Sequence, residues 1–341
     1  MMETVWFILW GVLWGVYFLL DGYDLGAGAL MPVMAKSEED RKKIYNSIGP
    51  FWDGNEVWLI TAGGVTFAAF PGTYATMFSA LYSALMLVLF ALILRGAGLA
   101  MREETANPRA RRFWDVLFYV GSFLAALLFG VFFANIFKGV PIDGEGVFHG
   151  NLFTLLNPYG LMGGLLFLVF FFTHGSIWLA LKTDGDLQER ATRSALRFWR
   201  VLLVISVLFL VFSGILTSLY DNYLANPVLF IIPVITVVSL VLTGIFVMKR
   251  DWYKSWWTSS IYILSATLFG VIGIYPSLMP SSIDPAFSRT IHNTASSPLT
   301  LKIMLGVVVV FVPIVIAYQA WIHKLFGGKV KGDRSAYHEG Y

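Results

Sequence analysis

Residues 227–248 read PVLFIIPVITVVSLVLTGIFVM, a run without a charged side chain. An apolar run of about 20 residues is long enough to cross the hydrocarbon core of a membrane as a helix. Similar runs fill most of the chain. The sequence therefore predicts an all-α integral membrane protein with nine transmembrane helices, near residues 5–34, 52–71, 74–95, 113–137, 157–181, 198–220, 227–248, 256–276 and 299–324.

The composition supports this class and excludes several kinds of site. Hydrophobic residues make up 57% of the 341 residues and charged residues only 13%, whereas a soluble domain has about 25% charged residues. Cysteine is absent, which excludes disulfides, iron–sulfur clusters and thiolate-bound metals within this chain. The formal net charge of +3 is distributed over short loops, so it indicates no nucleic-acid partner.

Basic residues are distributed unevenly between the two sides of the predicted helices. All but three of the 24 Lys and Arg lie in the connections after spans 1, 3, 5 and 7 or in the C-terminal tail, and the exceptions are Lys138, Arg289 and Lys302. Because Lys and Arg concentrate in cytoplasmic loops, this split predicts an external N-terminus and a cytoplasmic C-terminus. The first apolar run follows no basic segment and is too long for a signal peptide, so we expect it to be retained.

Two acidic islands interrupt the first two spans. Residues 20–26 read LDGYDLG and residues 52–58 read WDGNEVW. In each island two acids stand three positions apart, which places Asp21 beside Asp24 and Asp53 beside Glu56 on one helix face. An acid at membrane depth costs roughly 2.5–3.5 kcal/mol. We therefore expect these acids to serve an ion path, a proton path or a buried ion pair.

The predicted orientation places both islands in the cytoplasmic half of the membrane, where Arg95 ends span 3 and Asp115 begins span 4. The sequence thus predicts that five acids converge around Arg95: Asp21, Asp24, Asp53, Glu56 and Asp115. One interpretation is a structural ion-pair network, because an arginine fork can bind carboxylates bidentately. The other is a proton route open to the cytoplasm, because one arginine cannot neutralise several acids at close range.

Other residues around the islands indicate packing. Gly22 and Gly26 continue a stripe of span 1 that starts with Gly11 and Gly15, and small residues at this spacing let helices approach closely. Trp52 and Trp58 flank the second island. A tryptophan there can anchor a helix at the membrane interface, but Trp58 should lie inside the membrane and is expected to pack.

Histidine content argues against a haem in this chain. Of the five histidines only His174 lies well inside a predicted span, and His323 lies at the end of the last one. A haem within the membrane needs one or two axial ligands inside the spans. We therefore expect this chain to bind no haem by itself, and we find no metal-ligand motif in it.

Several motifs together resemble one family, subunit II of the cytochrome bd-type quinol oxidases. Besides residues 20–26, the matching pieces are the long motif NSIGPFWDGNEVWLI, which contains Asn55, and four shorter ones. In order, these pieces are residues 46–60, 67–71, 121–123, 155–161 and 279–282.

The resemblance implies a heterodimeric oxidase of the bacterial cytoplasmic membrane that oxidises quinol and reduces O₂ to water with cytoplasmic protons. It implies that subunit I carries the quinol site and three haems, of b and d type or b-type variants. A small single-helix accessory subunit is a partner that the resemblance leaves open, and membrane lipid surrounds the complex. We expect the glycine stripe of span 1 to contribute to the interface with subunit I.

The resemblance also implies an architecture of two four-helix bundles and a peripheral helix within one membrane domain. The bundles would comprise residues 1–137 and 157–276, the ninth helix residues 299–324 and the cytoplasmic tail residues 325–341.

Two other hypotheses remain open at this point. A proton-coupled secondary transporter would also need buried acids, but it should show repeat symmetry and a polar site at the middle of the bilayer. A subunit without any proton role would keep the acids only as ion pairs.

Overall fold

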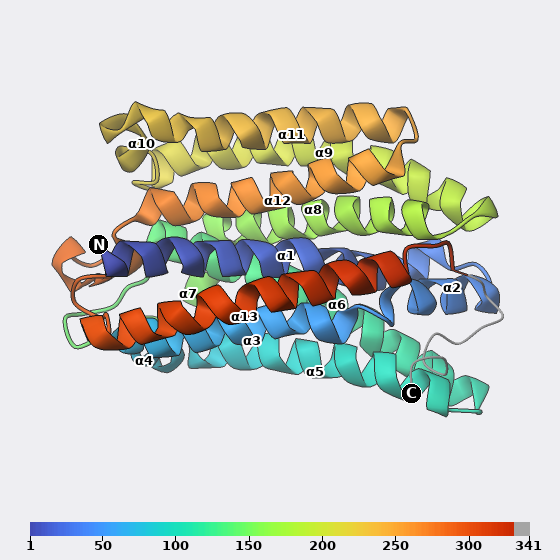
Figure 1. Cartoon of the computed structure of the whole chain (residues 1–341), viewed down its shortest axis with the longest axis horizontal. Coiled ribbons are helices and arrows are strands. Elements are labelled where there is room, and N and C mark those ends of the chain that lie inside the picture. The colour runs from blue at the N-terminus through green and yellow to red at the C-terminus, as the bar shows by residue number, and fades with distance from the viewer. Residues whose placement is uncertain (331–341) are drawn as a thin grey trace.

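The computed structural model describes residues 1–330 as an elongated bundle whose long helices lie along one axis (Figure 1). The last eleven residues of the predicted tail, 331–341, lie outside the described part. The helices are α1 (Met2–Met34), α2 (Glu38–Ile48), α3 (Trp52–Ala69), α4 (Pro71–Ala80), α5 (Tyr82–Glu104), α6 (Pro108–Lys138), α7 (Leu152–Leu155), α8 (Pro158–Lys182), α9 (Gly185–Leu216), α10 (Asp221–Ala225), α11 (Ile231–Met248), α12 (Trp252–Ile274) and α13 (Pro298–Leu325). Two 3₁₀ turns (Pro227–Phe230 and Pro285–Phe287) and an antiparallel pair of short strands, β1 (Ser277–Met279) and β2 (Arg289–Thr290), complete the described chain.

The fold class predicted from the apolar runs is confirmed at the level of an all-helical membrane protein. Within residues 1–330, eight helices are long and apolar enough to cross a membrane. The predicted second span, α3, is a continuous helix of 18 residues but is not among the eight. Its first two turns contain Asp53, Asn55 and Glu56, and these polar side chains lower its hydropathy. The number nine and the orientation therefore stay predictions.

The helices differ in extent from three of the predicted spans. The predicted third span is divided into α4 and α5, and α5 continues beyond Arg95 to Glu104. Helix α6 begins at Pro108, where the side chain of Asn107 accepts a hydrogen bond from the Arg109 N–H, and not at residue 113. Helix α9 begins at Gly185, not at residue 198. Polar helical turns extend these helices past the apolar runs, because a helix is ended by its caps and not by the edge of the hydrocarbon core.

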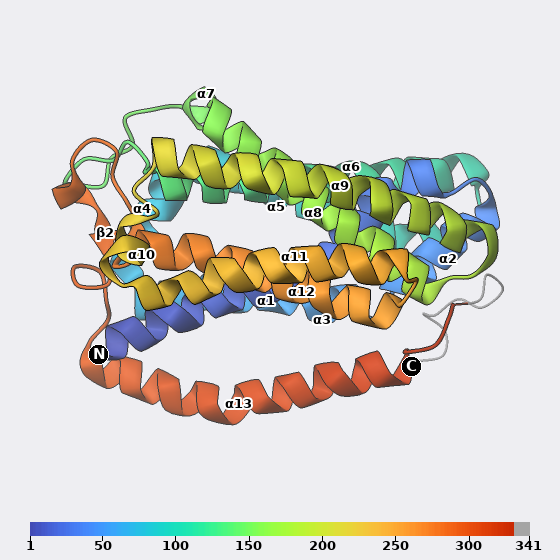
Figure 2. The same cartoon turned by 90° about the horizontal axis from the view of Figure 1, so that it is seen from above.

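Helix α1 occupies the centre of the bundle and packs against α3, α6, α8 and α12 (Figures 1 and 2). Its glycine stripe makes this possible. A Cβ on Gly11 or Gly15 would collide with side chains of α12, and a Cβ on Gly22 or Gly26 would collide with Phe171 of α8. The predicted packing role is thus observed. The stripe is, however, buried within this chain, so the expectation that it contacts subunit I is wrong.

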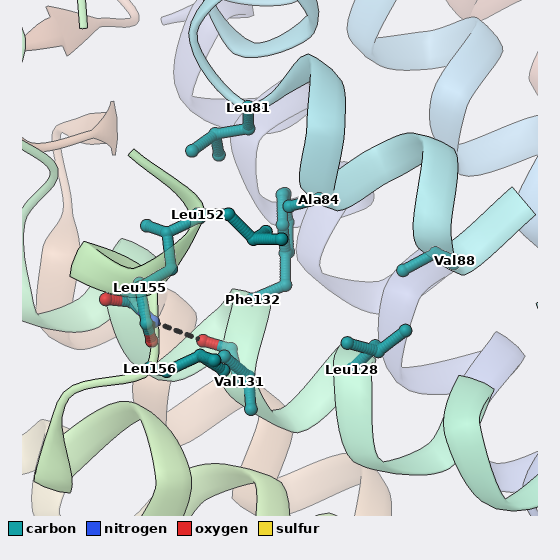
Figure 3. Close-up of a pocket in the computed structure, with 10 residues that line it drawn as sticks. Leu81, Ala84, Val88, Leu128, Val131, Phe132, Leu152, Leu155 and Leu156 are labelled. Carbon is teal, nitrogen blue, oxygen red and sulfur yellow. Dashed lines mark hydrogen bonds between the residues drawn. The ribbon is translucent and has the colours of Figure 1, made fainter. Parts of the chain in front are cut away.

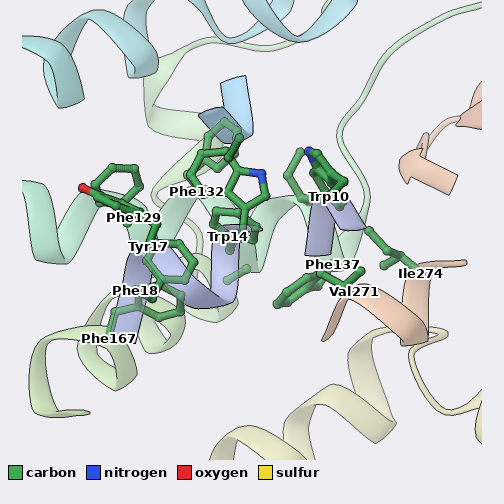
Figure 4. Close-up of a cluster of buried hydrophobic side chains, with 14 of the residues drawn as sticks. Trp10, Trp14, Tyr17, Phe18, Phe129, Phe132, Phe137, Phe167, Val271 and Ile274 are labelled. Atoms are coloured by element: carbon green, nitrogen blue, oxygen red, sulfur yellow. The ribbon is translucent and has the colours of Figure 1, made fainter. Parts of the chain in front are cut away.

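Aromatic side chains fill the space around the first half of α1 (Figure 4). Phe18 meets Phe133 and Phe167 edge to face, with ring centroids 5.2 and 5.0 Å apart, and Trp14 lies 5.0 Å from Phe133. Edge-to-face pairs of this kind stabilise a core beyond the area that they bury. The cluster holds α1, α6 and α8 together and so determines where the acids of α1 lie.

Helix α13 lies on the outside of the bundle (Figure 2). Within α13, which the structure describes in full, only Leu301 is buried. Polar contacts hold its two halves: Trp6 donates to the Leu301 carbonyl at 3.0 Å, and Gln319 donates to the Gly54 carbonyl at 2.9 Å. The helix therefore lies along α1 and the first turn of α3.

Candidate functional site: a buried carboxylate cluster

Arg95 is the centre of a buried ionic cluster. Its guanidinium, fully buried on α5, forms a bidentate pair with Asp21, with Nη1 to Oδ2 at 2.7 Å and Nη2 to Oδ1 at 2.5 Å. Glu56 Oε1 lies 3.1 Å from Nη1, and Asp24 Oδ2 lies 3.9 Å from Nη2. Three of the five predicted acids thus converge on Arg95.

The local fold explains this convergence. Asp21 and Asp24 stand one turn apart on α1, and Glu56 lies in the second turn of α3, which packs alongside α1. The neighbouring Asn55 is fully buried and its amide donates to Asp24 Oδ2 at 2.8 Å, to the Tyr23 hydroxyl at 2.8 Å and to the Leu20 carbonyl at 3.2 Å. Asn55 therefore fixes the position of Asp24 relative to α3.

The cluster contains more negative than positive groups. Three carboxylates surround one guanidinium, and only Glu56 among them reaches the surface, with 25% of its side chain exposed. Ionised carboxylates in a low-dielectric site repel one another, and one guanidinium balances the charge of only one of the three. Asp24 Oδ1, Asn55 Oδ1 and Arg95 Nε have no hydrogen-bond partner among residues 1–330. The cluster therefore has a formal excess of carboxylates over cations.

Asp115 does not join this cluster, so the prediction that it lies near Arg95 is wrong. Its carboxylate lies 2.6 Å from Arg102 Nε and 3.4 Å from Arg41 Nε, and it accepts a hydrogen bond from Tyr45 at 2.9 Å. The reason is that α5 continues for two further turns to Arg102, while α2 folds back to supply Tyr45. Asp115 belongs to a second ionic network at the α2 end of the molecule.

Asp53 also lies apart from Arg95. Its side chain is exposed in the first turn of α3 and forms no ion pair within the described chain. The same outer face of α3 exposes Val57, Ile60, Gly64 and Phe67. Among the three carboxylates around Arg95, Glu56 is thus the one that reaches the surface, and it stands three positions after Asp53 on α3.

Reasoning from charge alone missed Tyr23. Its ring stacks on Trp178 with centroids 4.1 Å apart, and its hydroxyl lies 3.3 Å from His323 Nε2 of α13. Tyr23 therefore connects the cluster to the peripheral helix. Its position between Asp21 and Asp24 in the first acidic island was the only signal available in the sequence.

The two flanking tryptophans pack as interior residues. Trp58 is buried on α3, as expected for a residue inside the membrane. Trp52 is partly buried and lies against Gly96 of α5. Both hold α3 against the bundle near the cluster.

His174, the histidine well inside a predicted span, is fully engaged in hydrogen bonds. Both ring nitrogens of His174 have partners, Ser259 Oγ at 2.7 Å and the Leu19 carbonyl at 2.9 Å, and residues 1–330 contain no group of three metal-ligating side chains. A small pocket between α5, α6 and α7 (Figure 3) has a volume of about 30 Å³ and is lined by apolar side chains, apart from Asn135. Asn135 donates to the Leu155 carbonyl at 2.8 Å. This pocket has no titratable group.

Comparison with known proteins agrees with the motifs. The family model for cytochrome bd terminal oxidase subunit II matches residues 2–326. The cytochrome bd-I ubiquinol oxidase subunit 2 of Escherichia coli is 35% identical, with 97% of this chain and 96% of that protein covered. The cytochrome bd ubiquinol oxidase subunit 2 of Bacillus subtilis is 32% identical, with 96% and 97% covered.

A solved structure has the same fold. The bd oxidase from Geobacillus thermodenitrificans contains a chain that superposes with a TM-score of 0.76 at 18% sequence identity, over 95% of this chain and 98% of that one. At this identity the match concerns the fold alone.

Proposed function

Because this chain belongs to the subunit II family of cytochrome bd terminal oxidases, we propose that its buried carboxylate cluster accepts protons that the complex uses to reduce O₂. The chain is a multi-pass membrane component of a terminal quinol oxidase, which contains haem and includes subunit I. The family assignment leaves the transporter hypothesis without support. The observation that carries the proposal is the excess of buried carboxylates around Arg95, with Glu56 reaching the surface.

We place nine helices across the bacterial cytoplasmic membrane, with the N-terminus outside. Helix α3 supports this number because it lies antiparallel along α1: Trp10 donates to Thr66 at 2.9 Å, and Asn55 donates to the Leu20 carbonyl at 3.2 Å. Helix α3 therefore lies beside the part of α1 between Trp10 and Leu20, which is inside the predicted first span. In this arrangement the helices up to residue 137 form one four-helix bundle, those within 157–276 a second, and α13 is the peripheral ninth helix.

We assign the haems, of b and d type, and quinol oxidation to subunit I, and support and proton supply to this chain. The proposed route begins at the exposed Asp53, continues at Glu56 and ends at Asp24 and Asp21. Asp115, locked between Arg102 and Arg41, is left outside it.

We propose that subunit I covers the outer face of α3. An exposed carboxylate on a membrane helix is costly against lipid and is expected to face protein or water, and Asp53 shares its face with Val57, Ile60, Gly64 and Phe67. A Cβ on Gly63 or Gly64 would meet no atom of residues 1–330 within 4 Å, which leaves room for a closely packed partner helix.

Asp53→Asn and Glu56→Gln test the route, because both remove an ionisable proton with little change in volume. We expect slower quinol-dependent O₂ consumption by the purified complex, with haem content and yield preserved. Asp186→Asn is the matched control, since Asp186 is also exposed but lies on α9 away from the cluster. Wild-type turnover in both assembled variants would reject the proton route and leave the ion-pair interpretation.

A further inference from the structure

Three arginines follow one another along an exposed line of α9. Arg193, Arg197 and Arg200 are exposed and stand four and three positions apart, so they lie on one helix face. The same line continues with exposed apolar side chains, Val204, Val207, Val211 and Ile215. One face of α9 therefore changes from cationic to apolar at residue 200.

The length of the apolar part of α9 indicates the depth in the membrane at which the cationic part begins. From Val201 to Leu216 the helix contains no charged residue and rises about 24 Å, which is close to the thickness of the hydrocarbon core, about 30 Å. Arg200 then lies at the edge of the hydrocarbon. Arg197 and Arg193 lie within about 11 Å beyond it along the helix, at the depth of the lipid headgroups.

Arg197 and Arg200 have no acidic partner within the described chain, whereas Arg193 lies near Glu189, one turn earlier on α9. Within the described chain, no ion pair includes Arg193, Arg197, Arg200 or Lys249, the residue that follows α11. Helix α11 packs against α9 through Trp199, which donates to the Leu240 carbonyl at 2.8 Å. The adjacent Arg250 and Lys254 are paired with Glu189 and Asp251.

Basic residues in and around α2 include both paired and unpaired cations. At the same end of the molecule, four other basic residues all have acidic partners: Arg41, Lys43, Arg102 and Arg190. Lys36 and Lys42, in or near α2, are also exposed and form no ion pair within the described chain. What distinguishes the α9–α11 face is that its unpaired cations continue into an exposed apolar line, Val204, Val207 and Val211.

We propose that this face binds an anionic phospholipid, with the phosphate at Arg197 and Arg200 and the acyl chains along Val204, Val207 and Val211. Cations at headgroup depth attract anionic lipids, and the apolar continuation of the same line favours a lipid over a soluble phosphate. The site is independent of the proposed proton route, since α9 carries none of the residues of that route.

The test compares Arg197→Gln/Arg200→Gln with the wild-type complex in detergent, using native mass spectrometry to titrate dioleoylphosphatidylglycerol. From the usual contribution of one basic residue, we expect roughly 25-fold weaker binding after the loss of two. Arg197→Lys/Arg200→Lys should bind within a few-fold of wild type, because it keeps the charge. Lys36→Gln/Lys42→Gln removes two exposed cations near or on α2 and should leave binding unchanged.

Three results would overturn the proposal. The first is unchanged phosphatidylglycerol binding in the glutamine variant. The second is equal binding of dioleoylphosphatidylcholine and phosphatidylglycerol by the wild type, since the site would then not select charge. The third is full displacement of the lipid by millimolar inorganic phosphate, which would mean that the acyl chains contribute nothing. If the glutamine variant fails to assemble, Arg200→Gln alone provides the same comparison.

Discussion

At the scale of single residues, the pair between Arg95 and Asp21 differs from the other acidic contacts of the cluster. It is bidentate and both side chains are fully buried, whereas Asp24 lies 3.9 Å from the guanidinium and Glu56 is partly exposed. Arg95 therefore depends on Asp21 for its counter-charge. The geometry therefore divides the roles within the cluster. Asp21 suits a mainly structural role, and Glu56 suits a proton-carrying one.

Asp21→Asn should reduce the yield of assembled complex. Removing one partner of a buried ion pair leaves an uncompensated charge and typically costs about 3–5 kcal/mol. We expect a lower thermal transition and less complex by fluorescence-detected size-exclusion chromatography, in contrast to Glu56→Gln. An Asp21→Asn complex with wild-type stability would show that Arg95 draws its counter-charge from Glu56 or Asp24.

At the scale of elements, the approach of α1 to α8 decides whether the acids of α1 can reach α3 and α5. Gly26 faces the Phe171 carbonyl and Gly175 of α8, and Gly22 faces the Phe171 ring. The two helices meet with backbone close to backbone, an approach that only small residues allow.

Gly26→Leu should separate α1 from α8 and lower the yield of the complex, because the new side chain has no space between the two backbones. Gly306→Leu is the control, since a Cβ at this position of α13 meets nothing within 4 Å in the described part of the chain. The measurement is the amount of membrane-inserted chain co-purifying with subunit I. Equal yields of the two variants would mean that the α1–α8 contact tolerates expansion.

At the scale of the whole molecule, the proposed nine-helix arrangement assigns each connection between helices to one side of the membrane. The connection between α5 and α6 and the start of α12 lie on one side, and the loops after α6 and after α12 lie on the other.

Reporter fusions after residues 40, 105, 190 and 252 should give a cytoplasmic signal, and fusions after 145 and 288 an external one. The physical reason is the concentration of Lys and Arg in the first group of connections. Paired alkaline phosphatase and green fluorescent protein fusions provide the measurement. An inverted signal at any of these sites would contradict the arrangement.

The sequence by itself was sufficient for the membrane class, the family, the approximate positions of the long helices and the meeting of Asp21, Asp24 and Glu56 with Arg95. Apolar length and the spacing of acids on a helix face are local properties, so they can be read along the chain. The helix ends at Glu104, Pro108 and Gly185 could not be read in this way, because polar turns continue a helix beyond the apolar run.

Tertiary structure alone decided which groups are neighbours. It placed Asp115 with Arg102 rather than Arg95, turned Asp53 to the outer face of α3, connected Tyr23 to His323 and buried the glycine stripe against α8 and α12. Each of these depends on how far one helix slides or rotates against another. The position of one helix against another results from packing between segments distant in the sequence, and no local sequence pattern predicts it.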